Sequence, residues 1–133
     1  SALDAIAVYA CSDKSKYSGI VGGYALYAAM GDIILVDGVM IETPHEWNYV
    51  QNGDIPNEWS TVVVVGHTGS DNPCNLKTQG ARNGQVVTVV NSNTSHRINV
   101  KNIRGKEAWI LENCCGTFRF VNNYGWIREK FDN

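Results

Sequence analysis

The sequence lacks the features that mark membrane and nucleic-acid-binding proteins. No stretch of its 133 residues approaches the roughly 20 apolar residues of a membrane-spanning helix, and no basic and apolar leader opens it, so no membrane insertion is expected. The 11 Lys and Arg residues are scattered among 13 Asp and Glu residues without a run of like charge. A surface that tracks nucleic-acid phosphates is therefore not expected either.

Motifs for metals, phosphates and cofactors are missing as well. The sequence has no CxxC or HxxxH spacing, and His45, His67 and His96 lie far apart in three polar segments, which disfavours a metal site. The glycine-rich segment 19–23 lacks both the spacing and the trailing Lys of a phosphate-binding loop. We therefore predict that the chain uses no cofactor and no metal.

Catalytic chemistry has two starting points, both weak. Glycan-cleaving enzymes use a pair of carboxylates about 5 to 10 Å apart. One polar segment supplies four acids, namely Glu42, Glu46, Asp54 and Glu58. A Cys-His nucleophile would need Cys114 or Cys115 to meet His67 or His96 in the fold. Solvated loop acids and unreactive thiols are the simpler interpretation, so we do not expect an enzyme.

The four cysteines leave two interpretations open. They are Cys11, Cys74, Cys114 and Cys115. A chain of this length does not need disulfides to be stable, so free and mostly buried thiols are the first interpretation. The alternative is one long-range disulfide that joins Cys11 or Cys74 to one member of the adjacent pair. The adjacent pair itself is a poor bridge, because neighbouring residues of a strand point to opposite faces.

Short β-branched or aromatic runs separated by Asn, Gly and Ser are what the sequence does contain, and they predict an all-β fold. The clearest runs lie at residues 61–65, 85–90, 97–103, 108–113, 117–121 and 125–128. With further strands before them they give about eight or nine strands, spaced by about ten residues, which is typical of an antiparallel β-sandwich or jelly roll. Because no repeat or linker interrupts the chain, residues 1–133 are predicted to form a single domain.

The segments between these runs carry their own predictions. Asp37-Gly38 separates two apolar runs and predicts a hairpin there. Residues 42–60 and 66–80 are rich in turn-forming residues and are predicted to be long loops, and the polar turn 91–95 is predicted to join its flanking strands as a hairpin. The Ala-rich runs 5–10 and 24–30, bounded by glycines, are interpreted as strands.

The second half of the chain also carries a family resemblance. From Gly84 to Trp126 the sequence runs through a Gly-Gln pair, a Val/Thr strand ending in Asn, a polar turn, Ile-Asn-Val, Trp-Ile-Leu, Phe-Arg-Phe and Tyr-Gly-Trp. This order resembles the closing half of head domains in trimeric phage tail fibres and related viral or bacterial fibre tips. The resemblance implies a small sandwich, a homotrimer about a threefold axis, and a place on a virion or phage surface or outside a cell.

Recognition of a cell-surface glycan or another host-surface receptor is the predicted function, and the two long loops supply its chemistry. Aromatic rings pack against sugar C–H groups, and polar side chains hydrogen-bond hydroxyls. The candidate ligand-binding residues are Trp47, Tyr49 and Trp59 in the first loop and His67, Asp71 and Asn72 in the second. The tryptophans in these loops are equally compatible with plugging the open end of a sandwich. Trp109 and Trp126 fit core or subunit-interface positions better.

Two alternatives to receptor binding remain at this point. The same fold serves a capsid-type or trimerisation module without a ligand, and a glycan-cleaving tailspike domain would need the acids named above. A trimer has a physical motive, since the Ala- and Gly-rich segments 5–10 and 19–30 suit packing against symmetry mates. A charged residue at Ala28 or Ala29 is therefore predicted to dissociate the oligomer.

Overall fold

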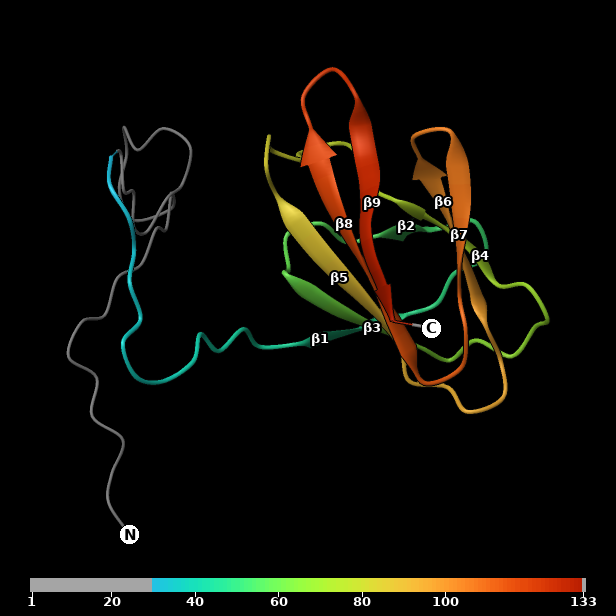
Figure 1. The fold of residues 1–133 in the computed structure, drawn as a ribbon. Helices are drawn as coiled ribbons and strands as arrows, with labels where there is room; N and C mark the ends of the chain where they lie inside the picture. Colours follow the sequence, from blue (N-terminus) through green and yellow to red (C-terminus); the bar gives the residue numbers. More distant parts are fainter. Residues whose placement is uncertain (1–29, 133) are drawn as a thin grey trace, which may run out of the picture. The chain divides into compact units, whose positions relative to one another are not determined.

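The computed structural model describes residues 30–132 of the chain (Figure 1). The chain divides into two compact units, residues 1–39 and residues 40–133, which are described separately. Of the first unit, only residues 30–39 belong to the described part. The Ala-rich strand predicted at 5–10, all but the last residue of the one predicted at 24–30, the contact residues Ala28 and Ala29, and Cys11 lie outside it.

The second unit is built of strands, as the residue pattern predicts. Between residues 30 and 132 the structure has nine strands and no helix. They are β1 (His45–Asn48), β2 (Asp54–Ile55), β3 (Thr61–Val65), β4 (Pro73–Leu76), β5 (Val86–Asn91), β6 (Ile98–Ile103), β7 (Lys106–Ile110), β8 (Cys114–Val121) and β9 (Gly125–Asp132). The all-β prediction is confirmed for the described residues, and the predicted strands from residue 61 onward lie close to their observed positions.

Two parallel ladders are interleaved along the chain. The strand order is β1-β3-β5-β8-β9-β6-β4-β2, with β7 paired to β6 (Figure 1). Odd-numbered β1, β3 and β5 pair in parallel, and even-numbered β2, β4 and β6 do the same in a second ladder. Each connection from β1 to β6 therefore crosses from one ladder to the other. The two-stranded β8 and β9 ladder joins the two sides.

The expectation of an antiparallel arrangement is wrong for most of the strand pairs in the described residues. Antiparallel pairing is limited to β5 with β8, β6 with β7, and β8 with β9, whereas the other five strand pairs are parallel. The predicted hairpin around 91–95 does not form, because β5 and β6 belong to different ladders. The loop predicted over 66–80 contains β4. Parallel neighbours need long crossovers, and here each crossover includes a strand of the other ladder.

The core lies between the two ladders and follows from the period-two pattern of each strand. Val62 and Val64 of β3 and Val87 and Val89 of β5 are fully buried from one side. The remaining buried hydrophobic residues come from the other ladder, from β7 and from the closing strands, namely Ile55, Cys74, Leu76, Ile98, Val100, Ile103, Ala108, Ile110, Phe118 and Trp126. Trp126 is held further by its indole N–H, which donates to the Lys77 carbonyl oxygen at 3.1 Å. Its burial confirms the core alternative predicted for this tryptophan.

Residues 30–44 form no strand, so the hairpin predicted at Asp37-Gly38 is wrong. The chain does bend at 36–38, where Gly38 has a φ of 107°. The runs on either side remain unpaired and exposed within the described part of the chain. A short hairpin alone is marginal in water, so turn chemistry without a third strand or a covering face does not fix the pairing.

Candidate functional site

Strand direction brings four loops to one end of the second unit. Strands β1, β3 and β5 run toward this end, and β2, β4 and β6 start from it. The loops 49–53, 66–72, 92–97 and 111–113 therefore meet there, and we call this the loop end. Loops on a rigid sheet are the common location of binding residues, so the loop end is the candidate site.

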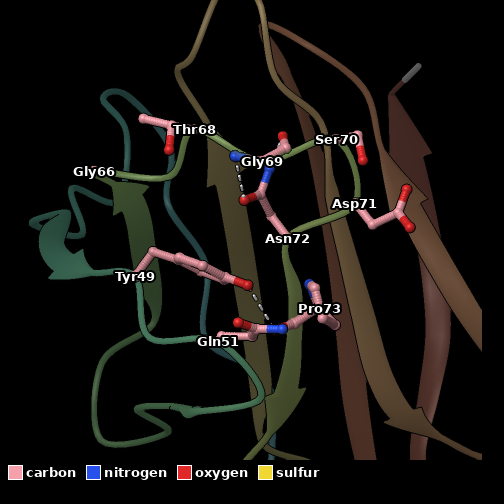
Figure 2. A pocket seen from close by; sticks show the side chains of 9 residues that line it. All are labelled: Tyr49, Gln51, Gly66, Thr68, Gly69, Ser70, Asp71, Asn72 and Pro73. Carbon is pink, nitrogen blue, oxygen red and sulfur yellow. Dashed lines mark hydrogen bonds between the residues drawn. The ribbon is translucent and has the colours of Figure 1, made fainter.

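A hollow of about 510 Å³ opens between the first two of these loops (Figure 2). Its lining residues are Tyr49, Gln51, Gly66, Thr68, Gly69, Ser70, Asp71, Asn72 and Pro73. Figure 2 shows Tyr49 on one side of the hollow and Ser70 and Asp71 on the far side. Residues that carry hydroxyl, amide and carboxylate groups thus surround a space that is also lined by an aromatic residue.

The Tyr49 side chain is fixed in the wall of this hollow. Its hydroxyl donates a hydrogen bond of 3.1 Å to the carbonyl oxygen of Pro73, and its ring has edge contacts with Trp47 and His67. Desolvation by burial raises the pKa of Tyr49, and the nearby Cys74 thiol adds to the shift. The phenol is therefore a neutral hydrogen-bonding group at physiological pH, and the ring offers an oriented apolar face.

Asn72 shapes the opposite wall. Its side-chain amide donates to the carbonyl oxygens of Gly69 at 2.7 Å and Arg97 at 2.8 Å, and its Oδ1 accepts from the Gly69 N–H at 3.1 Å. The residue is buried and adopts a left-handed backbone with a φ of 48°. Asn tolerates this conformation better than most residues do. The closed turn holds Ser70 and Asp71 outward into solvent.

A second hollow of about 560 Å³ adjoins the first. Its lining residues are Thr68, Ser70, Ser95, His96, Arg97 and Glu112. Thr68 and Ser70 line both hollows, so they form a ridge between them. The Arg97 guanidinium lies 4.3 Å from the centre of the Trp109 ring and 3.4 Å from Asp71 Oδ1. The stacking and the ion pair orient this cation beside the ridge.

Asn93 and His96 connect the remaining loops to this site. Asn93 Nδ2 donates to the carbonyl oxygen of His67 at 3.1 Å, and its Oδ1 accepts from the N–H groups of Ser95 and His96. His96 Nδ1 lies 3.1 Å from the Gly69 carbonyl oxygen. A carbonyl oxygen only accepts, so His96 carries its proton on Nδ1 in this contact. The loop end is therefore one connected hydrogen-bonded structure.

The structure separates the six residues that the sequence put forward as a ligand-binding group. Tyr49, Asp71 and Asn72 line the first hollow, whereas His67 lies buried beneath it. Trp47 is half-buried and packs against the core. Trp59 lies at the opposite end of the unit, where its ring stacks on His45 with the centroids 4.6 Å apart. Strand β2 carries the chain away from the loop end before Trp59, which explains the separation.

Several lining residues are not among the six ligand-binding candidates from the sequence. They are Gln51, Thr68, Ser70, His96, Arg97 and Glu112. Gln51 and Ser70 belong to the two loops already singled out, but nothing in their spacing distinguishes them from other polar loop residues. Arg97 and Glu112 come from loops that the interleaved ladders bring next to the second loop. Only the strand pairing reveals that proximity.

The reactive groups considered from the sequence lie in different places. Glu46 is on β1, Asp54 is on β2 and Glu58 is in the loop after it, and all three are exposed. Cys74, Cys114 and Cys115 are free thiols, and burial raises the pKa of Cys74 to about 12. A disulfide from Cys74 to the adjacent pair is therefore wrong.

In the described part of the chain no group of three or more His, Cys, Asp or Glu side chains is placed to hold a metal ion. Residues 30–132 also contain no helix long and apolar enough to cross a membrane. Comparisons with protein-family models and with curated protein sequences find no match to this chain.

Proposed function

We propose that the chain is the receptor-binding tip of a trimeric fibre and that the loop end recognises a cell-surface glycan. One observation carries the recognition step. The residues that line the first hollow include an aromatic residue, Tyr49, and residues that carry hydroxyl, amide and carboxylate groups, namely Thr68, Gln51 and Asp71. A sugar presents apolar C–H faces and a ring of hydroxyls, so both parts of the lining have a counterpart on such a ligand.

Rigidity of the lining supports the same proposal. Tyr49 is hydrogen-bonded to Pro73, and Asn72 is hydrogen-bonded to Gly69 and Arg97, so both walls are set before a ligand arrives. A preformed site loses less conformational entropy on binding than a mobile loop does. The polar groups that face solvent, Ser70 and Asp71, are then presented in a defined orientation.

The remaining parts of the proposal rest on the fibre-tip resemblance and on the layers of the fold. The two parallel ladders enclose one core, which is consistent with a sandwich-like head although its pairing is not that of a jelly roll. The proposed assembly is a homotrimer on a virion, phage or extracellular surface. We propose binding without catalysis and without a cofactor or metal.

A glycan array with the full chain tests recognition, followed by calorimetry on the best glycan. Asp71→Asn keeps the size of the side chain and removes its charge. Asp54→Asn makes the same change on β2, where Asp54 is also exposed but is not among the lining residues. We expect at least about a tenfold weaker affinity for Asp71→Asn, because a hydrogen bond to a charged group contributes on the order of 1.5 kcal/mol or more.

The outcomes separate the alternatives. Weaker binding by Asp71→Asn with unchanged binding by Asp54→Asn supports the loop end as the site. Equal affinities for both variants would move the site elsewhere on the chain. No binding on the array would favour a structural module without a ligand, and release of oligosaccharide during incubation with surface polysaccharide would favour a glycan-cleaving domain.

A further inference from the structure

Residues 30–41 expose an unusual amount of apolar surface. Eight large side chains in this segment are between 58% and 93% exposed. They are Met30, Ile33, Ile34, Leu35, Val36, Val39, Met40 and Ile41. Single exposed hydrophobic residues are normal, but a contiguous set of this size marks a surface that another molecule covers.

The rest of the described chain offers no counterpart to this segment. The other large exposed hydrophobic residues between 42 and 129 are Val50, Leu111, Tyr124 and Ile127. They belong to the loops 49–53, 111–113 and 122–124 and to β9, so they are distributed over both ends of the second unit. Residues 42–129 therefore present no apolar patch of a size that matches the exposed segment.

We propose that residues 33–41 are covered by the same residues of a second copy of the chain, as the contact that holds the oligomer together. Each buried side chain of this kind removes on the order of 100 Å² from water, so the seven exposed ones between residues 33 and 41 together approach the roughly 800 Å² per partner of a stable interface. Around a symmetry axis the same apolar segment of each copy lies near the axis, so the copies can cover each other's exposed side chains.

Backbone chemistry points to the same partner. The segment is rich in β-branched residues, which favour strands, and within residues 30–44 no strand pairing uses its N–H and C=O groups. Around a threefold axis each segment satisfies these groups by pairing with the segment of the neighbouring copy. The bend at 36–38, with Gly38 at a φ of 107°, divides this pairing into two short parts.

A membrane surface suits the segment less well. Asp32, Asp37 and Glu42 are its charged residues, and residues 30–44 contain no Lys or Arg. Interfacial membrane segments carry cations that attract anionic headgroups, so three acids and no base disfavour that partner. Between copies, the acids lie at the margins and the bend, and the apolar residues lie between them.

This inference refines the homotrimer of the proposed function and does not depend on glycan binding. The Ala-rich segments 5–10 and 19–30 were the contact expected from sequence, whereas the exposed apolar side chains place a contact at 33–41. The oligomer and the glycan site are therefore separable, because oligomeric mass reports on the first and the glycan array reports on the second.

The test is the mass of the full chain by light scattering, with Lys substitutions that place a charge in the proposed contact. Ile34→Lys and Val36→Lys lie in the segment, and Val50→Lys is the control because Val50 is also exposed, at 58%. We expect the wild type and Val50→Lys to be oligomers of one defined mass. We expect both segment variants to lose at least about tenfold in association constant, which one buried charge is sufficient to cause.

Each possible result has a defined meaning. A monomeric or heterogeneously aggregated wild type would overturn the proposal, and so would an oligomer whose mass is unchanged in both segment variants. An oligomer that Val50→Lys also dissociates would point to a contact at the loop end instead. Amide hydrogen exchange on the wild type gives a second measurement that needs no variant to fold. Protection of the N–H groups of 33–41 that is lost on dilution is expected, and exchange without protection in the oligomer would overturn the proposal.

Discussion

His67 and Asn91 form a buried hydrogen bond of 2.9 Å between His67 Nε2 and Asn91 Oδ1, directly beneath the loop end. The Asn91 amide nitrogen lies within hydrogen-bonding distance of the carbonyl oxygens of His96, Ile110 and Leu111. Because these oxygens only accept, the amide orientation is fixed and Asn91 Oδ1 must be the acceptor from His67. His67 therefore carries its proton on Nε2. One side chain thus ties three of the four site loops together.

Replacing Asn91 by Asp is expected to destabilise the protein strongly. The carboxylate has the same size as the amide but places negative charge against carbonyl oxygens that need a donor. A buried group left without its partner costs about 1–3 kcal/mol, and more than one is affected, so we expect a loss of at least about 3 kcal/mol. Urea unfolding measures this loss. The deficit should shrink toward acidic pH, because a protonated carboxyl group regains one donor.

The matched control for that variant is Asn102→Asp. The Asn102 amide donates to the Leu76 carbonyl oxygen at 2.7 Å, but the side chain is exposed, so water replaces the lost donor. Its loss is expected to stay near or below about 1 kcal/mol. Similar losses for the two variants would mean that Asn91 does not have the central role assigned to it.

The thiol of Cys74 predicts how stability depends on alkaline pH. Burial raises its pKa from an ordinary 9.0 to about 12. A group whose pKa is higher in the folded state contributes stability that is complete below the unfolded value and is lost as pH rises through the folded value. The free energy of unfolding should therefore fall between pH 9.0 and about 12, by up to about 1.4 kcal/mol per pH unit for this group.

Removal of the thiol checks that assignment. Cys74→Ala is expected to lower stability near neutral pH, because it leaves a cavity in the core, and to flatten the alkaline slope. Tyr49→Phe is the companion variant, since the pKa of Tyr49 is raised as well and its hydroxyl contributes to the same region of pH. A slope that persists in Cys74→Ala and disappears in Tyr49→Phe would assign the alkaline transition to the phenol.

Gly53 allows a close approach that no other residue would permit. A Cβ at this position would lie 2.8 Å from the Val50 Cβ and 2.9 Å from the Val50 carbonyl oxygen. The Gly53 N–H also donates to that oxygen at 2.8 Å, so the turn cannot open without losing the bond. We expect Gly53→Ala to cost about 1–3 kcal/mol in thermal unfolding.

A double-mutant cycle separates the steric cause from backbone effects. Val50→Gly removes one of the two atoms in the clash, so combining it with Gly53→Ala should cost less than the sum of the single changes. Because the turn carries Tyr49 and Gln51, the single variant should also weaken glycan binding. Strict additivity of the two substitutions would argue that the close approach is not what selects glycine.

The residue types in the sequence were sufficient to predict where the strands lie, but not which strands pair with each other. The runs at Thr61–Val65 and Val86–Asn91 are visible as β-branched stretches, and both are strands. Their parallel pairing is not visible, because each strand lies beside one that is far away in the chain and the intervening spans differ. His45 pairs with Val62, whereas Thr61 pairs with Thr88. The separation along the sequence differs between the two pairs, so no fixed repeat period indicates the parallel ladder.

The buried polar residues of the site were also only partly predictable from the sequence. Asn91 was interpreted as the start of a polar turn, yet it continues the inward face of Val87 and Val89 at period two, and that spacing was a usable signal. His67 gave no such signal. Gly66, with a φ of 83°, breaks the alternation of β3 just before it and turns the imidazole inward.

Asn72 combines an unusual backbone with three hydrogen bonds, and two substitutions distinguish these contributions. Asn72→Gly keeps access to the left-handed conformation but removes the bonds to Gly69 and Arg97, whereas Asn72→Ala loses both. The residue precedes Pro73, which further restricts its backbone. We expect Asn72→Ala to be less stable than Asn72→Gly by about 1 kcal/mol, since a Cβ makes the left-handed region costly.

Both variants should lose glycan affinity, because the amide that closes the turn behind Ser70 and Asp71 is gone in each. Thermal unfolding and calorimetry measure the two effects separately. Equal stability of the two variants would show that hydrogen bonding alone selects Asn, and unchanged affinity in both would show that the turn does not position the binding groups.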